Sequence, residues 1–120
     1  METVPEIAYD LISRSKSPLT IVYPKAKNLP KSILPFDGTI AIRVVHGKYS
    51  GEVIRRFGKA LVSTSANITD HPTATFFDQI EDYIKEGVDH VVTVFRGTMH
   101  TVKPSRIIKL RGDGSFEVIR

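Results

Sequence analysis

Three stretches of the chain place apolar side chains at the spacing of one helix face. In the first, Ile7, Leu11 and Ile12 fall on a common face. The second begins at Ser50, a residue type that caps helix N-termini, and a glycine closes both the second and the third stretch. The sequence therefore predicts three helices, at residues 5–14, 50–58 and 75–87.

Short apolar runs rich in β-branched residues lie between and after these helices, and most are bounded by proline or glycine. They predict six strands, at residues 18–24, 39–44, 60–63, 90–95, 106–110 and 116–120. The turn signal "RGDGS" between the last two runs predicts a hairpin. Because strands and helices alternate through the middle of the chain, the predicted fold is α/β with a mixed sheet.

Composition narrows the class of protein. The 120 residues suffice for one domain, and 41% hydrophobic with 25% charged residues is typical of a globular protein. The absence of cysteine excludes disulfides, thiolate metal sites and cysteine catalysis. No apolar run approaches the ~20 residues that span a membrane, and the acidic N-terminus does not read as a signal peptide. We expect a cytoplasmic protein without a membrane partner.

The formal net charge of +4 favours an anionic ligand such as nucleotide phosphates or a nucleic-acid backbone. Ordinary surface lysines explain the same value equally well. The charge therefore leaves both interpretations open.

Motifs for the common catalytic chemistries are missing from the sequence. It contains no paired carboxylates at recognisable spacing, no glycine-rich phosphate loop and no nucleophile elbow. The four histidines are scattered, so their spacing does not indicate a metal site. We assign neither a catalytic residue nor a metal ligand.

The segment "ALVSTSAN" is the strongest candidate for chemistry. Its apolar run ends in Ser63, Thr64, Ser65 and Asn67. Ligands of open α/β sheets bind beyond the carboxyl ends of strands, where short hydroxyl and amide side chains can donate hydrogen bonds to phosphate or carboxylate oxygens. The alternative is a hydroxyl-rich turn that only caps the following helix.

Arg43 is a second candidate, because it is charged and stands late in an apolar strand. Its guanidinium group suits a carboxylate or a phosphate. An exposed strand end would explain the residue as well.

Taken together, the segments "SPLTIVYP", "GTIAIRV", "LVSTSAN", "PSRIIKL" and "FEVIR", in this order, resemble the YrdC/Sua5 family. The resemblance covers nearly the whole chain, and "STSAN" after "IRV" is its most specific part. It implies an open, twisted, mixed β-sheet with flanking helices. It also implies synthesis of threonylcarbamoyl-AMP from L-threonine, bicarbonate and ATP, with Mg²⁺ accompanying the ATP, for the t6A modification of tRNA.

The resemblance also implies roles for single residues. Those matched to nucleotide contacts in the family are Thr39, Ser65, Asn67, Thr73 and Arg120. Those matched to threonine contacts are Arg43, Ser63 and Ser105.

The sequence departs from the family pattern at several places. Asp70 stands where a glycine is usual, and Arg106 stands where a threonine is usual. The family's "PTxTxYGL" segment is missing from these 120 residues, and its N-terminal K-x-R motif has no counterpart in place. We interpret residues 1–120 as a single partial domain, the C-terminal two-thirds of the family fold, truncated at its N-terminus. We expect it to be inactive alone and to self-associate through the truncated edge.

Two other functions remain open at this stage. One is a YrdC-like module that binds double-stranded RNA or tRNA without catalysis. The other is a structural homologue that binds no ligand.

Overall fold

The computed structural model describes residues 4–93 and 105–120. Along the chain it contains α1 (Glu6–Arg14), β1 (Leu19–Tyr23), η1 (Lys31–Ile33), β2 (Ile40–Arg43), α2 (Lys48–Phe57), η2 (Phe77–Gln79), α3 (Asp82–Glu86), β3 (Arg106–Leu110) and β4 (Phe116–Val118), where η marks a 3₁₀-helix. The chain divides into two compact units. The first comprises residues 1–58 and 104–120, and the second comprises residues 59–103.

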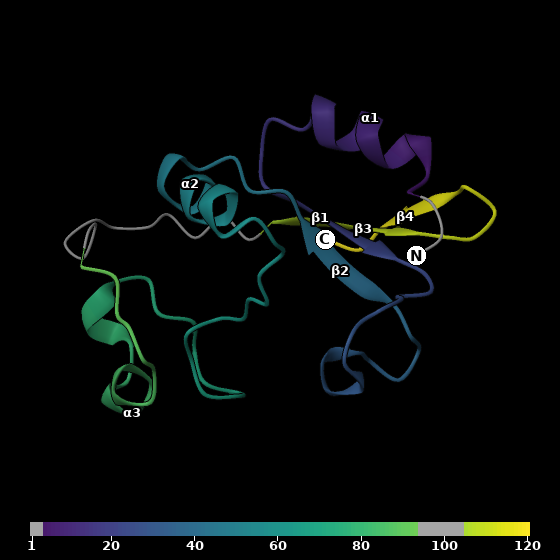
Figure 1. Cartoon of the computed structure of the whole chain (residues 1–120). Helices are drawn as coiled ribbons and strands as arrows, with labels where there is room; N and C mark the ends of the chain where they lie inside the picture. Colours follow the sequence, from purple (N-terminus) through teal and green to yellow (C-terminus); the bar gives the residue numbers. More distant parts are fainter. Residues whose placement is uncertain (1–3, 94–104) are drawn as a thin grey trace. The chain divides into compact units, whose positions relative to one another are not determined.

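The first unit contains an open, mixed, four-stranded sheet with the strand order β2-β1-β3-β4 (Figure 1). β1 is antiparallel to β2 and parallel to β3, and β3 and β4 form an antiparallel hairpin. The predicted mixed sheet, the closing hairpin and the α/β fold class are therefore confirmed.

The core of this unit lies between the sheet and α1, which crosses one sheet face (Figure 1). Alternate residues of β1 are buried there, and Ile21 is 1% exposed. Ile108 and Leu110 of β3 and Ala8 of α1 complete the buried cluster. Because strand side chains alternate, Thr20 belongs to the opposite face of the sheet, the face that α1 does not cover.

The two α-helices of this unit lie where the sequence predicted them, but the N-terminal cap of α2 differs from the prediction. α1 occupies the predicted stretch. α2 begins at Lys48 after Gly47, so the prediction that Ser50 caps this helix is wrong. Gly58 ends α2 in the left-handed conformation, at φ 72°, and its N–H donates to the Ile54 carbonyl.

The second unit departs furthest from the sequence prediction. Residues 60–63 pair with no strand in the described part of the chain, and Val62 is 78% exposed. The single helix predicted for residues 75–87 is divided into η2 and α3 by extended backbone at Ile80. The side chain of Gln79 accepts hydrogen bonds from two backbone N–H groups just before η2, which closes a separate turn there.

The predicted strand at residues 90–95 is not formed over residues 90–93, and its last two residues lie outside the described part of the chain. Gly87 closes α3, as predicted from the sequence. Among the described helices, none combines the length and the apolarity needed to cross a membrane.

Candidate functional site

Four polar residues lie close together at one end of the β2-β1-β3 part of the sheet. Thr20 is the cross-strand partner of Arg43 in the antiparallel β1–β2 pair. The Thr20 Oγ1 and Ser105 Oγ atoms are hydrogen-bonded at 2.8 Å, although 85 positions separate the two residues in the sequence. Ser105 directly precedes β3, which pairs with β1 in parallel. The parallel pairing therefore brings the two hydroxyl groups together.

Arg120 joins this group from the end of the chain. Its backbone carbonyl accepts a hydrogen bond from the Ile107 N–H at 2.8 Å. Its guanidinium Nε and Nη2 donate to the Ser105 carbonyl at 3.4 and 3.3 Å, which are long contacts. The Arg120 side chain is exposed, so its charge remains accessible to an anion.

Arg43 itself is exposed, and within the described residues its guanidinium makes no hydrogen bond or ion pair. An arginine that makes no ion pair within the described residues, at the strand position across from Thr20, suits the recognition of a small carboxylate. The predicted threonine contacts Arg43 and Ser105 thus lie in one group within the first unit.

Thr39 stands just before β2 and is bound to a local turn. Both its backbone N–H and its hydroxyl donate to Asp37 Oδ1, at 3.1 and 2.7 Å. These hydrogen bonds, with the ammonium group of Lys109 3.7 Å from Asp37 Oδ2, hold the pKa of the Asp37 carboxyl below its usual range. The Thr39 hydroxyl proton is therefore engaged, while its oxygen can still accept a hydrogen bond.

The remaining predicted site residues belong to the second unit. Ser63, Ser65 and Thr73 are exposed, and no hydrogen bond of their side chains occurs within the described part of the chain. Asn67 differs, because its Nδ2 donates to two backbone carbonyls, those of Ile68 and His71, both at 3.0 Å.

The predicted site residues therefore fall into two sets, one in each unit. The first unit holds Thr39, Arg43, Ser105 and Arg120, and the second holds Ser63, Ser65, Asn67 and Thr73. Sequence reasoning missed Thr20, which looked like an ordinary β-branched strand residue. The available signal was a hydroxyl residue inside an otherwise apolar strand.

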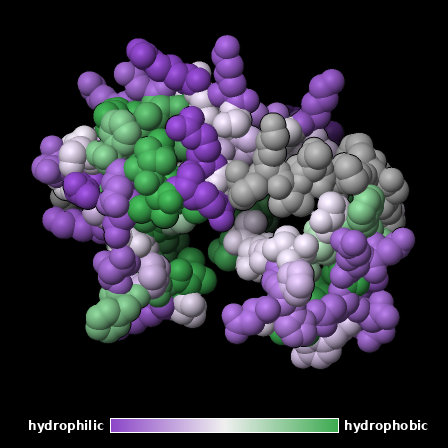
Figure 2. Space-filling view, turned by 180° about the vertical axis from the view of Figure 1, so that it is seen from behind, coloured by the Kyte–Doolittle hydropathy of each residue, from purple (hydrophilic) through white to green (hydrophobic). Residues whose placement is uncertain are grey.

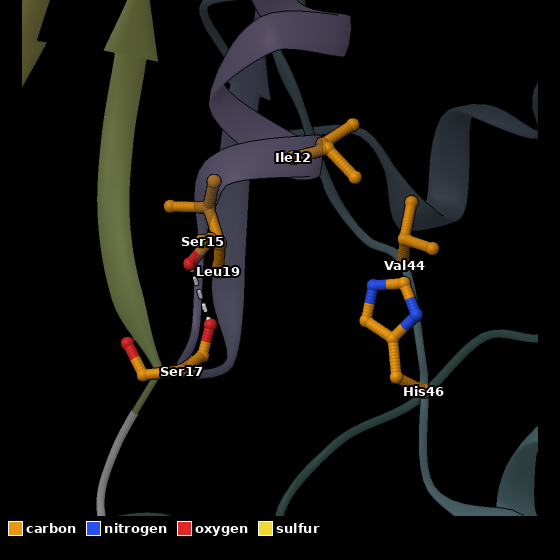
Figure 3. A pocket seen from close by; sticks show the side chains of 6 residues that line it. All are labelled: Ile12, Ser15, Ser17, Leu19, Val44 and His46. Atoms are coloured by element: carbon orange, nitrogen blue, oxygen red, sulfur yellow. Dashed lines mark hydrogen bonds between the residues drawn. The ribbon is translucent and has the colours of Figure 1, made fainter.

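A small recess and a larger groove lie on the first unit. A small recess between the end of α1 and the chain after β2 is lined by Ile12, Val44, His46 and their neighbours (Figure 3). It encloses about 10 Å³, roughly one water, whereas ligand pockets enclose ~300–1,000 Å³. The Ser15 hydroxyl, which also lines the recess, already donates a hydrogen bond to the Ser17 carbonyl. The recess is not a ligand site.

A larger groove of about 390 Å³ runs between α1 and the β3–β4 hairpin. Apolar side chains, including Leu11, Phe116 and Val118, line much of it, and Arg14 and Arg106 also contribute. The space-filling view shows hydrophobic side chains gathered on this unit and bordered by hydrophilic ones (Figure 2, left). None of the predicted site residues lines this groove.

Metal-binding side chains are not grouped in the part of the chain that the structure describes. No set of three or more histidine, aspartate or glutamate residues lies close enough together there to hold a metal ion.

Comparison with known proteins identifies the relatives of the chain. The Sua5/YciO/YrdC family model, described as "Telomere recombination", matches residues 1–120. A threonylcarbamoyl-AMP synthase of Pseudoalteromonas translucida (strain TAC 125) is 34% identical over 83 residues, covering 69% of this chain and 44% of the relative. A threonylcarbamoyl-AMP synthase of Idiomarina loihiensis is 29% identical over 100 residues, covering 83% of this chain and 53% of the relative.

The chain thus spans about half the length of the curated relatives it matches. No solved structure matches it.

Proposed function

The chain belongs to the Sua5/YciO/YrdC family, and from this we propose that it forms the threonine- and nucleotide-binding part of an L-threonylcarbamoyladenylate synthase domain. Such a domain converts L-threonine, bicarbonate and ATP into threonylcarbamoyl-AMP and pyrophosphate for the t6A modification of tRNA. The shared name of the relatives, threonylcarbamoyl-AMP synthase, supports the proposal. We assign the protein to the cytoplasm, where these substrates occur.

The polar group formed by Thr20, Arg43 and Ser105 is the observation that carries the proposal. An amino acid presents a carboxylate and an ammonium group within a few ångströms of each other. The Arg43 guanidinium, which has no partner among the described residues, suits the carboxylate, and the Thr20–Ser105 hydroxyl pair offers both donors and acceptors. Ser63 is the further threonine contact in this proposal.

The nucleotide is assigned to exposed polar groups. Ser65 and Thr73 offer hydroxyl donors to phosphate oxygens, and Arg120 offers a cation. Thr39 contributes the acceptor capacity that its bond to Asp37 leaves free. Mg²⁺ enters with ATP, held by the phosphate oxygens, because this ion usually binds through substrate phosphates and few protein ligands.

Threonine binding to an Arg43→Gln variant tests the proposal. Hydrogen bonds to charged groups contribute about 1.5–3 kcal/mol, so L-threonine affinity measured by calorimetry should fall roughly 10- to 100-fold. Arg55→Gln is the matched control, because Arg55 lies on exposed α2 and pairs with Glu52. Equal affinity in wild type and Arg43→Gln would contradict the proposal. We expect these 120 residues alone to release no pyrophosphate, because the cations of the family's N-terminal K-x-R motif have no counterpart in place.

RNA binding without catalysis is the second candidate function, supported by the net charge of +4 and by the exposed arginines of α2. Glu52 bonds both Arg55 and Arg56, which reduces the positive charge of that surface. Titration of tRNA or double-stranded RNA at rising salt tests this candidate. If the protein binds RNA through its phosphates, the affinity falls steeply as the salt concentration rises. If no RNA is bound at low salt, this candidate function is rejected.

A further inference from the structure

The Asn67 side chain closes a turn in its own loop. Its two amide hydrogens are directed at the carbonyls of Ile68 and His71, and the His71 N–H donates to the Ile68 carbonyl at 2.9 Å. Asp70 within this turn has φ 68°, a left-handed conformation that aspartate tolerates better than most residues. The turn over residues 68–71 therefore depends on the amide of Asn67.

This arrangement leaves Asn67 little to offer a phosphate. Its remaining polar atom, Oδ1, is buried and has no hydrogen-bond partner within the described residues. Oδ1 is only an acceptor, so it repels phosphate oxygens. A reversed amide would place Oδ1 against two carbonyl oxygens, so the two carbonyls fix the orientation of the group.

A second side-chain interaction connects the same turn to the residue that precedes α3. His71 Nδ1 lies 2.6 Å from Oε1 of Glu81, the residue directly before α3. The two side chains are 52% and 40% exposed. Exposed ion pairs add little to stability, so the effect of this pair is chiefly to fix where the turn lies relative to α3.

We propose that Asn67, His71 and Glu81 are positioning residues that hold the turn over residues 68–71 and so present the hydroxyl of Ser65 to the nucleotide. This inference rests on the proposed function, in which Ser65 contacts the ATP phosphates. It changes the role of Asn67 from a phosphate ligand to a clamp within the loop. It also gives a role to Glu81, which sequence reasoning did not consider.

The test compares ATP affinity in Glu81→Leu and Glu81→Gln. Leucine removes the acceptor for His71, whereas glutamine keeps an oxygen that can accept the same hydrogen bond. We expect ATP affinity, measured by calorimetry, to fall roughly 3- to 10-fold in Glu81→Leu, because the turn loses the hydrogen bond that fixes its place. Glu81→Gln should restore most of it. Asp82→Leu is the control, because the one ion pair that Asp82 makes within the described residues is with Lys85, outside the loop.

The free protein provides an independent readout. In ¹⁵N–¹H spectra recorded without ATP, Glu81→Leu and Asn67→Ala should both shift the backbone amide signal of Ser65, and Asp82→Leu should not. If Asn67 instead donates directly to a phosphate, Asn67→Ala lowers ATP affinity while the Ser65 signal of the free protein stays in place. That result would overturn the inference.

The outcomes separate the inference from the function on which it rests. No ATP binding by the unaltered chain would reject the nucleotide function and, with it, the role of the clamp. ATP binding that is equal in the unaltered chain and Glu81→Leu would reject the clamp alone. A loss in Glu81→Leu that Glu81→Gln does not restore would also reject it, because the hydrogen bond to His71 would then not be the cause.

Discussion

Thr20 and Ser105 illustrate how single residues acquire a role through distant contacts. Each is a small hydroxyl residue whose presence in the sequence does not by itself indicate a functional role. Their hydroxyl groups lie 2.8 Å apart only because β1 and β3 pair in parallel. Arg43 lies on the adjacent strand, across from Thr20. The chemical meaning of all three residues depends on the pairing of the strands.

Replacing Thr20 tests the energetic value of the hydroxyl pair. We expect Thr20→Val to lower the free energy of unfolding by about 0.5–1.5 kcal/mol, because the part-buried Ser105 hydroxyl loses its partner. Urea denaturation measures the change, and Thr69→Val, at an exposed turn position, is the control. A double-mutant cycle with Ser105→Ala should give a non-zero coupling energy. Additive effects would show that the two hydroxyls act independently.

The Asp37–Thr39 turn makes a prediction about pH. Hydrogen bonds from Thr39 lower the pKa of Asp37, so the titration midpoint should lie below the ordinary aspartate value of about 3.9. The contribution of this turn to stability is therefore fully present above the ordinary pKa and is lost as the pH falls through the lowered pKa. NMR titration of the Asp37 carboxyl measures the midpoint. Thr39→Val, which removes only the hydroxyl bond, should raise it, and an unchanged midpoint would contradict this explanation.

At the scale of elements, the sequence predicted a strand correctly where its apolar residues are buried in the sheet. The β1 sequence predicted a strand, and every second residue of that strand is buried. The run at residues 60–63 has a similar apolar character, yet it has no strand partner in the described part of the chain. Apolar β-branched residues favour extended backbone, but a strand also needs a neighbour that satisfies its backbone hydrogen bonds.

The predicted helix at residues 75–87 failed for a local reason. Its apolar spacing fits a helix, and the Gln79 side chain competes with that structure. Gln79 Oε1 accepts the N–H groups of Thr75 and Phe76, which stabilises a short 3₁₀ turn in place of a longer helix. The spacing of hydrophobic residues carries no information about a side chain that accepts hydrogen bonds from nearby backbone N–H groups, so this pattern could not predict the interruption of the helix.

The turn between β3 and β4 gives a prediction for the hairpin. Gly114 has φ 84°, whereas Gly112 has no positive φ, and neither has an atom within 4 Å of where a Cβ would stand. Gly114→Ala should therefore destabilise the protein by about 1–2 kcal/mol through backbone strain alone. Gly112→Ala is the matched control and should change stability little. Equal urea midpoints for the two variants would contradict the assigned turn conformation.

At the scale of the whole molecule, the exposed apolar surface of the hairpin has consequences for association. Phe116, Val118 and Ile119 are 45%, 54% and 53% exposed, and β4 is an edge strand of the four-stranded sheet. Open edges and apolar side chains favour pairing with another chain.

We therefore predict that the protein self-associates through this edge at roughly tens of micromolar, the range in which exposed edges drive association. Sedimentation velocity over a concentration series measures the effect. Val118→Lys should shift the distribution toward monomer by placing a charge on the edge strand. Val62→Lys, at an exposed position outside the sheet, should leave it unchanged. A monomer at all concentrations would show that the edge does not pair.

The sequence by itself determined the elements whose signals are local and agree with burial. These are α1, β1, β2 and the β3–β4 hairpin, together with the family resemblance that its short motifs express. Tertiary structure decided which polar groups meet. The bond between Thr20 and Ser105 and the tie from His71 to Glu81 join residues that no local pattern relates. The spacing of apolar side chains indicates which residues of one element are buried. It does not indicate hydrogen bonds between distant residues, because these depend on how separate segments pack.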